Sequence, residues 1–116
     1  MNFRNLTVYK KSYDFVIKIY KLLKSFPKDE LFGIVDQIKR ASVSIVLNIA
    51  EGYSKNMSNK EIVRFLRISK GSAGEVAVLL ELSRDLKFID NETSNRLIKD
   101  LDEVERMLYG LIKTLM

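Results

Sequence analysis

The sequence contains no cysteine and no histidine. Without cysteine, the chain cannot form a disulfide scaffold, a thiolate zinc site or a cysteine nucleophile. Without histidine, it lacks the side chain that most often acts as a general base near neutral pH. These two absences exclude several common classes of enzyme and of metal-binding domain.

Turn-forming residues and long apolar runs are also scarce. One proline and five glycines among 116 residues favour a few long elements, and therefore helices. No apolar run approaches the roughly 18 residues of a membrane-spanning helix. The opening MNFRNLTVYKK has no apolar core of a signal peptide. We therefore expect a cytoplasmic protein with no membrane partner.

The hydrophobic pattern predicts an all-α fold with a single domain over residues 1–116 and no internal repeat or linker. Because the connections between helices are short, we expect an antiparallel up-down four-helix bundle. The helices are expected at about residues 7–25, 28–53, 58–87 and 91–115.

Local signals mark the expected helix starts. Proline is tolerated in a first helical turn and disfavoured in a helix interior, so Pro27 indicates that the second helix begins just after it. Ser58 followed by Glu61 is the pattern of a capping box, which opens the third helix. Asp90 or Asn91 is the expected N-cap of the fourth.

The helix at 7–25 is apolar over more than half of its circumference, whereas a bundle helix in a monomer needs a narrower stripe. The excess predicts contact with another subunit, and therefore a homo-oligomer. The alternative is that its tyrosines and phenylalanines only shield the edge of the bundle.

The helix at 28–53 is apolar on two sides, which predicts an inner element with polar residues between the two sides. The segment SKGSAGE at 69–75 is rich in small residues, which suggests close helix approach, and we expect it to pack against the stretch from Ser44 to Gly52. Buried polar groups need partners. The expected structural polar joint consists of Gln37, Arg40, Ser44, Asn48, Glu51, Gly52, Ser72 and Glu75.

Glu51 and Glu75 form the one pair of carboxylates that merits testing as catalytic groups. Di-iron carboxylate bundles pair glutamate with histidine, and no acidic cluster suited to magnesium is present. GSAG lies in the middle of a helix rather than in a phosphate-binding loop. We therefore expect no catalytic residue, no metal site and no cofactor, and Glu51 and Glu75 should accept hydrogen bonds from Arg40, Asn48 or Ser72 in the bundle.

The net charge is +5, and residues 1–28 hold seven Lys or Arg against one Asp. Such a basic region favours a polyanionic partner, and nucleic acid above all. No recognition helix and no aromatic-basic interleaving is evident, so contacts to phosphates are expected. The alternative is that the charge only keeps the protein soluble. The candidate nucleic-acid-binding residues are Lys10, Lys18, Lys21, Lys60, Arg64, Arg67 and Lys70.

Two segments carry a family resemblance. FPKDELFGIVDQIKRASVSIVLNIAEGYSK, followed by RFLRISKGSAGEV, resembles the four-helix-bundle proteins encoded in 23S rRNA intervening sequences. The related accessory proteins of diversity-generating retroelements share this pattern. NIAEG with a later GS-x-x-E is the specific part, and the resemblance extends to RMLYGLIKTL near the end.

The resemblance implies a four-helix bundle that assembles as a homopentamer with a central channel. The retroelement members bind nucleic acid through a basic surface and associate with a reverse transcriptase. Two functions are therefore expected from different classes: a non-enzymatic oligomer that binds RNA or DNA, or a protein-interaction scaffold, such as an accessory subunit of a reverse transcriptase, without nucleic-acid affinity of its own.

Overall fold

The computed structural model describes residues 2–54 and 56–116. Over these residues the chain forms four long α-helices and two short 3-10 helices, with no strand, so the prediction of an all-helical fold with four helices is confirmed. The elements are η1 (Phe3–Asn5), α1 (Thr7–Leu23), η2 (Lys28–Glu30), α2 (Ile34–Tyr53), α3 (Asn59–Asp85) and α4 (Asn91–Leu115).

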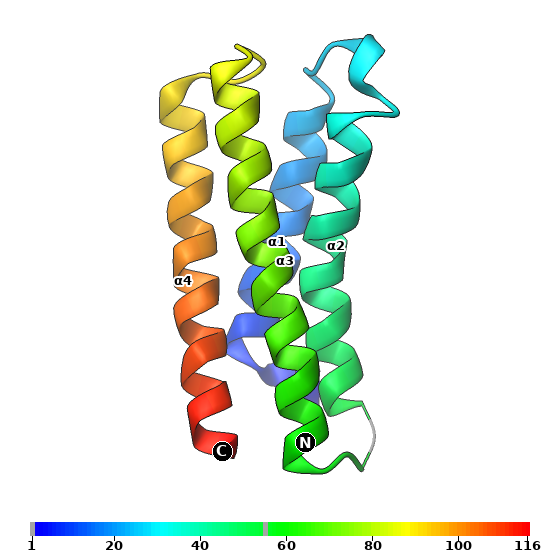
Figure 1. Ribbon diagram of the computed structural model, residues 1–116, viewed down its shortest axis with the longest axis vertical. Helices are drawn as coiled ribbons and strands as arrows, with labels where there is room; N and C mark the ends of the chain where they lie inside the picture. Colours follow the sequence, from blue (N-terminus) through cyan, green and yellow to red (C-terminus); the bar gives the residue numbers. More distant parts are fainter. Residues whose placement is uncertain (1, 55) are drawn as a thin grey trace.

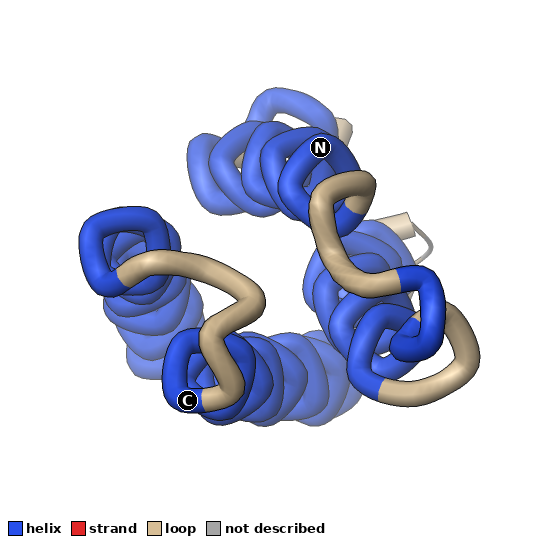
Figure 2. The backbone as a smooth tube through the Cα atoms, turned by 90° about the horizontal axis from the view of Figure 1, so that it is seen from above, coloured by secondary structure: helices blue, strands red, loops and turns tan. Residues whose placement is uncertain are grey.

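The four long helices lie side by side in a body of 43 × 23 × 20 Å (Figure 1). Seen from the end, α1 lies beside α2 and α4, and α3 lies beside the same two helices, so that α1 and α3 are diagonal to each other (Figure 2). The connections from α1 to α2 and from α3 to α4 lie at one end of the molecule, and the connection from α2 to α3 lies at the other (Figure 1).

The caps of α3 and α4 form as predicted. Ser58 Oγ accepts a hydrogen bond from the backbone N–H of Glu61, and the Glu61 carboxylate accepts one from the backbone N–H of Ser58, both at 3.2 Å. The Asp90 carboxylate accepts a hydrogen bond from the backbone N–H of Thr93 at 2.7 Å. Hydrogen bonds donated to these two carboxylates lower the pKa of Glu61 and of Asp90.

The predicted start of the second helix is wrong. Pro27 precedes only the single 3-10 turn Lys28–Glu30, and α2 begins six residues later than expected, at Ile34. Gly33 has φ −109° and ψ −116°, which lies outside the helical region and interrupts the helical path. Phe32, in the turn before it, is 93% exposed.

The core lies along the inner faces of all four helices. One apolar side of α2, a ridge that runs from Ile34 through Ile38 to Ile49, is buried throughout. The prediction that α2 is apolar on two buried sides is wrong, because Leu47 on its other side is 60% exposed. No helix within residues 2–54 and 56–116 combines the length and the apolar character needed to cross a membrane.

Candidate nucleic-acid interface

Small polar side chains join α2 to α3 at mid-length. Ser44 Oγ lies 2.8 Å from Ser72 Oγ across the two helices. Asn48 Nδ2 donates to the carbonyl oxygen of Ser44 at 2.8 Å and to its Oγ at 3.0 Å. Ser69 Oγ, fully buried, donates to the carbonyl oxygen of Ile45 at 2.8 Å. We call this contact between α2 and α3 the serine seam; three of the residues of the predicted joint, Ser44, Asn48 and Ser72, meet there.

Gly52 lies at the end of the serine seam, where α2 packs tightly against α3. It is buried, and a Cβ atom at this position would lie 3.2 Å from Phe65 Cβ and 3.7 Å from the Ile62 carbonyl oxygen. α2 ends one residue after Gly52, at Tyr53. A side chain at position 52 would be tightly packed against α3, so Phe65 would have to shift by a few tenths of an ångström to admit it.

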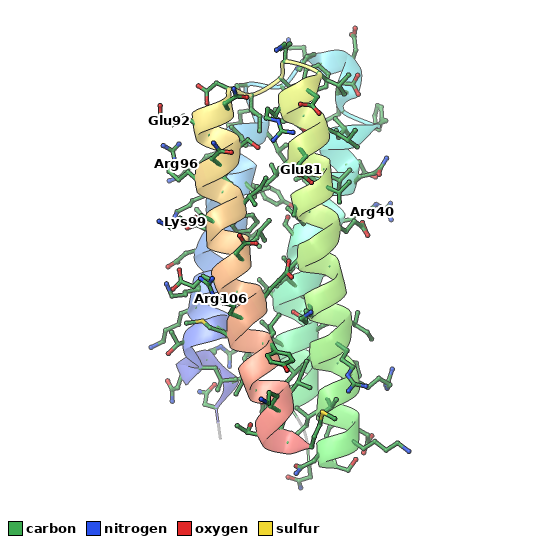
Figure 3. All side chains as sticks on the ribbon, turned by 60° about the vertical axis from the view of Figure 1, so that its left-hand side comes forward. Arg40, Glu81, Glu92, Arg96, Lys99 and Arg106 are labelled. Carbon is green, nitrogen blue, oxygen red and sulfur yellow. The ribbon has the colours of Figure 1, made fainter. Side chains whose placement is uncertain are left out.

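The other four residues of the predicted joint lie outside the seam. Gln37, Arg40, Glu51 and Glu75 are exposed, and Arg40 Nε donates to Asp36 on its own helix at 2.9 Å. Figure 3 shows Arg40 pointing away from α2. No hydrogen bond to the Glu51 or Glu75 carboxylate is found among the described residues, so the structure does not support their predicted place in the joint.

Chemistry at Glu51 and Glu75 finds no support in their surroundings either. Both side chains are exposed to solvent, on different helices. Across residues 2–54 and 56–116, no three acidic side chains come together in an arrangement that could hold a metal ion.

Gly71 and Gly74 lie on the opposite side of α3 from the serine seam. A Cβ atom at either position would meet nothing within 4 Å, so the prediction that these glycines pack closely against the second helix is wrong. They form one wall of a groove of about 840 Å³ between α3 and α4. Tyr109 and Ile112 of α4 form the facing wall.

A second hollow, of about 860 Å³, continues this groove toward the start of α3 and shares Arg67 and Met116 with it. We call the two together the α3–α4 groove. Its cationic residues are Lys60, Arg64, Arg67, Lys70 and Lys113.

Two of these cationic side chains make contacts with other residues of the chain. The Arg64 guanidinium lies over the Phe65 ring, 4.5 Å from its centroid, and Arg67 Nη2 lies 3.7 Å from Met116 Sδ. Among the described residues, no carboxylate lies within 4.0 Å of the cationic groups of the groove. Their charges are therefore available to an external anion.

The lysines of α1 are in a different situation. Lys18 Nζ lies 3.2 Å from Asp100, and Lys11 Nζ lies 2.6 Å from Glu103, so α4 supplies carboxylates to this strip. The hydrogen bond with Glu103 raises the pKa of Lys11, and the same bond lowers the pKa of Glu103. Lys10 and Lys21 are exposed. The positive charge of the α1 lysines is thus partly neutralised by carboxylates of α4, whereas that of the cationic residues on α3 is not.

Tyr109 and Lys113 were missed by the interpretation of the sequence. Tyr109 is 55% exposed, and Lys113 Nζ lies 5.5 Å from the centroid of its ring. This combination is not visible along any one helix, because the aromatic ring comes from α4 and two of its basic neighbours in the groove, Arg67 and Lys70, come from α3. A sequence signal exists in the i, i+4 spacing of Tyr109 and Lys113, but it does not reveal the facing helix.

Comparisons with known proteins agree with the fold. The model of the family described as 23S rRNA-intervening sequence protein matches residues 4–110. The chain is 28% identical to a protein of unknown function from the S23 ribosomal protein family of Bacteroides thetaiotaomicron, with a TM-score of 0.85 over 97% of this chain and 99% of that chain. A search of the curated proteins finds no match.

Proposed function

The chain belongs to the 23S rRNA-intervening sequence protein family, and from that premise we propose that it is a non-enzymatic helical bundle that binds RNA or DNA through the α3–α4 groove. The observation that carries this proposal is the set of five cationic residues around the groove. Cations that neutralise phosphates release condensed counterions, which drives binding without reading the base sequence.

The balance of charge favours the groove over α1. Two carboxylates line it: Glu61, which is held by the capping box of α3, and Glu105. The α1 lysines face Asp100 and Glu103, and Asp14 is exposed on the same helix. An approaching phosphate backbone therefore meets an excess of positive charge at α3 and a mixed surface at α1.

We propose in addition that the helices form an antiparallel up-down bundle and that copies of it assemble into a ring in the cytoplasm. Large apolar side chains are exposed both on α1 and on α3, which are diagonal in the bundle (Figure 2). Two different apolar faces on opposite sides favour head-to-tail contacts, which close into rings. The family resemblance implies five subunits. The exposed residues are Tyr13, Ile17 and Tyr20 on α1, and Val78, Leu82 and Leu86 along the last turns of α3 and its C-cap.

The test is binding of RNA and of duplex DNA across a range of salt concentrations. A phosphate binder loses affinity with a log–log slope of about 0.9 per neutralised phosphate on duplex DNA. We expect the double variant Arg64→Glu, Arg67→Glu to bind more weakly than the unmodified protein and to show a shallower slope.

The matched control is Arg96→Glu, Lys99→Glu, which changes two cations at the same i, i+3 spacing. Figure 3 shows Arg96 and Lys99 pointing away from the bundle on α4. This control should bind as the unmodified protein does. A third variant, Lys10→Glu with Lys21→Glu, measures the contribution of α1. If the unmodified protein binds neither probe at low salt, the proposal is wrong.

The second candidate is a protein-interaction scaffold, for which the exposed apolar residues of α1 and α3 are the favouring observation. It predicts a stable oligomer, no affinity for nucleic acid and a specific protein that co-purifies. A reverse transcriptase encoded beside this chain would identify that partner as one of the retroelement type.

A further inference from the structure

Besides its cationic residues, the α3–α4 groove has a stretch of exposed backbone and room for a small ligand. Its wall at Gly71 and Gly74 is bare backbone, because no side chain projects from these positions. Glycine inside a helix lowers stability relative to alanine, yet no neighbour approaches these two closely enough to require it. The volume of about 840 Å³ is in the range of pockets that enclose small molecules, roughly 300–1,000 Å³.

The aromatic ring of Tyr109 lies across the groove from this bare wall. Tyr109 lines the groove from α4 and is 55% exposed, so its ring is accessible to a ligand in the groove. Arg67 and Lys70 of α3 and Lys113 of α4 surround the same space. An exposed aromatic ring among cations is the arrangement by which proteins hold single-stranded nucleic acid, since every base offers a face for stacking.

We propose that the groove takes a single strand, with one unpaired base over Gly71 and Gly74 against the Tyr109 ring and its flanking phosphates at Arg67, Lys70 and Lys113. This inference rests on the proposed function and narrows its substrate class. In a duplex the bases are paired and stacked inside, so a duplex offers its phosphates and base edges but no free base face for stacking on Tyr109. The charge of the rim selects nucleic acid over an uncharged apolar partner.

The experiment compares three probes of equal length by fluorescence anisotropy: oligo(dT), the same strand paired with oligo(dA), and a strand whose central residues lack bases. Because stacking on an aromatic side chain contributes several-fold to binding per base, we expect oligo(dT) to bind about 5- to 150-fold more tightly than the base-free strand. Tyr109→Leu, which keeps apolar bulk but removes the ring, should abolish this ratio. Gly74→Leu, which fills the groove, should do the same.

Two controls accompany these variants. Tyr109→Phe keeps the ring and should retain the ratio. Phe32→Leu removes an exposed ring in the turn before α2, which is 93% exposed and does not line the groove, and should also retain it.

The outcomes separate this inference from the proposed function. Equal binding of oligo(dT) and the base-free strand, with strong salt dependence, overturns the stacking inference and leaves phosphate binding standing. No binding of any probe at low salt overturns both. If Tyr109→Leu or Gly74→Leu lowers the oligomer mass measured by light scattering, a second copy of the chain occupies the groove and the inference is overturned.

Discussion

The two sides of α3 carry small residues with opposite consequences. On the side of α2, Ser69 and Ser72 are tied to the neighbouring helix by hydrogen bonds of 2.8 Å, and Gly52 lets that helix approach closely. On the side of α4, Gly71 and Gly74 touch nothing and leave a groove open. Small residues therefore close one interface and hollow the other.

The difference teaches that a small residue in a helix has two structural uses. It removes a barrier to packing where a neighbour fills the space, and it creates a binding surface where none does. The serine seam is expected to determine stability, and the α3–α4 groove is expected to determine binding. Variants on each side can break or sharpen this division.

The largest effect is expected at Gly52, where α2 packs tightly against α3. Gly52→Val places side-chain atoms where Phe65 Cβ already lies 3.2 Å from the added Cβ. Overpacking of this kind costs about 1–3 kcal/mol in free energy of unfolding. Urea denaturation measures it, and an unchanged midpoint would show that the two helices can separate freely at this point.

The next effect separates two polar residues of α2 that the sequence placed in one joint. Asn48→Leu removes the hydrogen bonds to Ser44 and should cost about 0.5–1.5 kcal/mol. Glu51→Leu changes an exposed side chain and should stay within about 0.5 kcal/mol. If thermal unfolding shows equal losses of stability in the two variants, Glu51 contributes to the polar joint as the sequence predicts.

A smaller effect of opposite sign is expected in the groove. Gly71→Ala and Gly74→Ala should each raise the free energy of unfolding by about 0.5–1 kcal/mol, because alanine favours the helix and the added methyl group meets no neighbour. Thermal unfolding tests this. A loss of stability in either variant would mean that the groove closes on itself in solution.

The smallest effect is expected at the contact between α1 and α4. The polar contacts between these two helices are ion pairs on the surface, whereas those of the serine seam are made by buried hydroxyl groups. The pKa of Glu103 is lowered by Lys11, so this pair stabilises the fold above the ordinary pKa of 4.5 and ceases to do so as pH falls through the lower folded value. Lys11→Met should flatten that part of the curve of stability against pH. An unchanged curve would show that the pair contributes nothing in solution.

The sequence predicts the fold well because helix periodicity and capping are local. The ridge from Ile34 to Ile49 and the caps at Ser58 and Asp90 depend on residues within a few positions of each other. It fails at the start of α2, where Gly33 interrupts the helical path after Pro27, and it fails where the answer depends on the facing helix. The exposure of Glu51 and the open surroundings of Gly71 follow from the rotation of α2 and α3 about their axes, which no single helix specifies.

Of the residues of the candidate site, some were predicted from the sequence and others were not, for the same reason. Arg64 and Arg67 were found from their spacing on one helix, and the structure places both at the groove. Tyr109 and Lys113 were not found, because their significance arises only when α4 lies against α3. The pairing of Lys18 with Asp100 was missed for the same reason.

Adjacent residues on α3 give the most direct test of the division between seam and groove. Ser72→Ala removes a hydroxyl group from the seam, and Gly71→Glu places a negative charge in the groove. Stability and affinity for a single-stranded oligonucleotide at low salt are measured on both. We predict that Ser72→Ala loses stability and keeps its affinity, while Gly71→Glu keeps its stability and loses affinity. If Ser72→Ala abolishes binding from an intact fold and Gly71→Glu leaves it unchanged, the functional site lies in the seam.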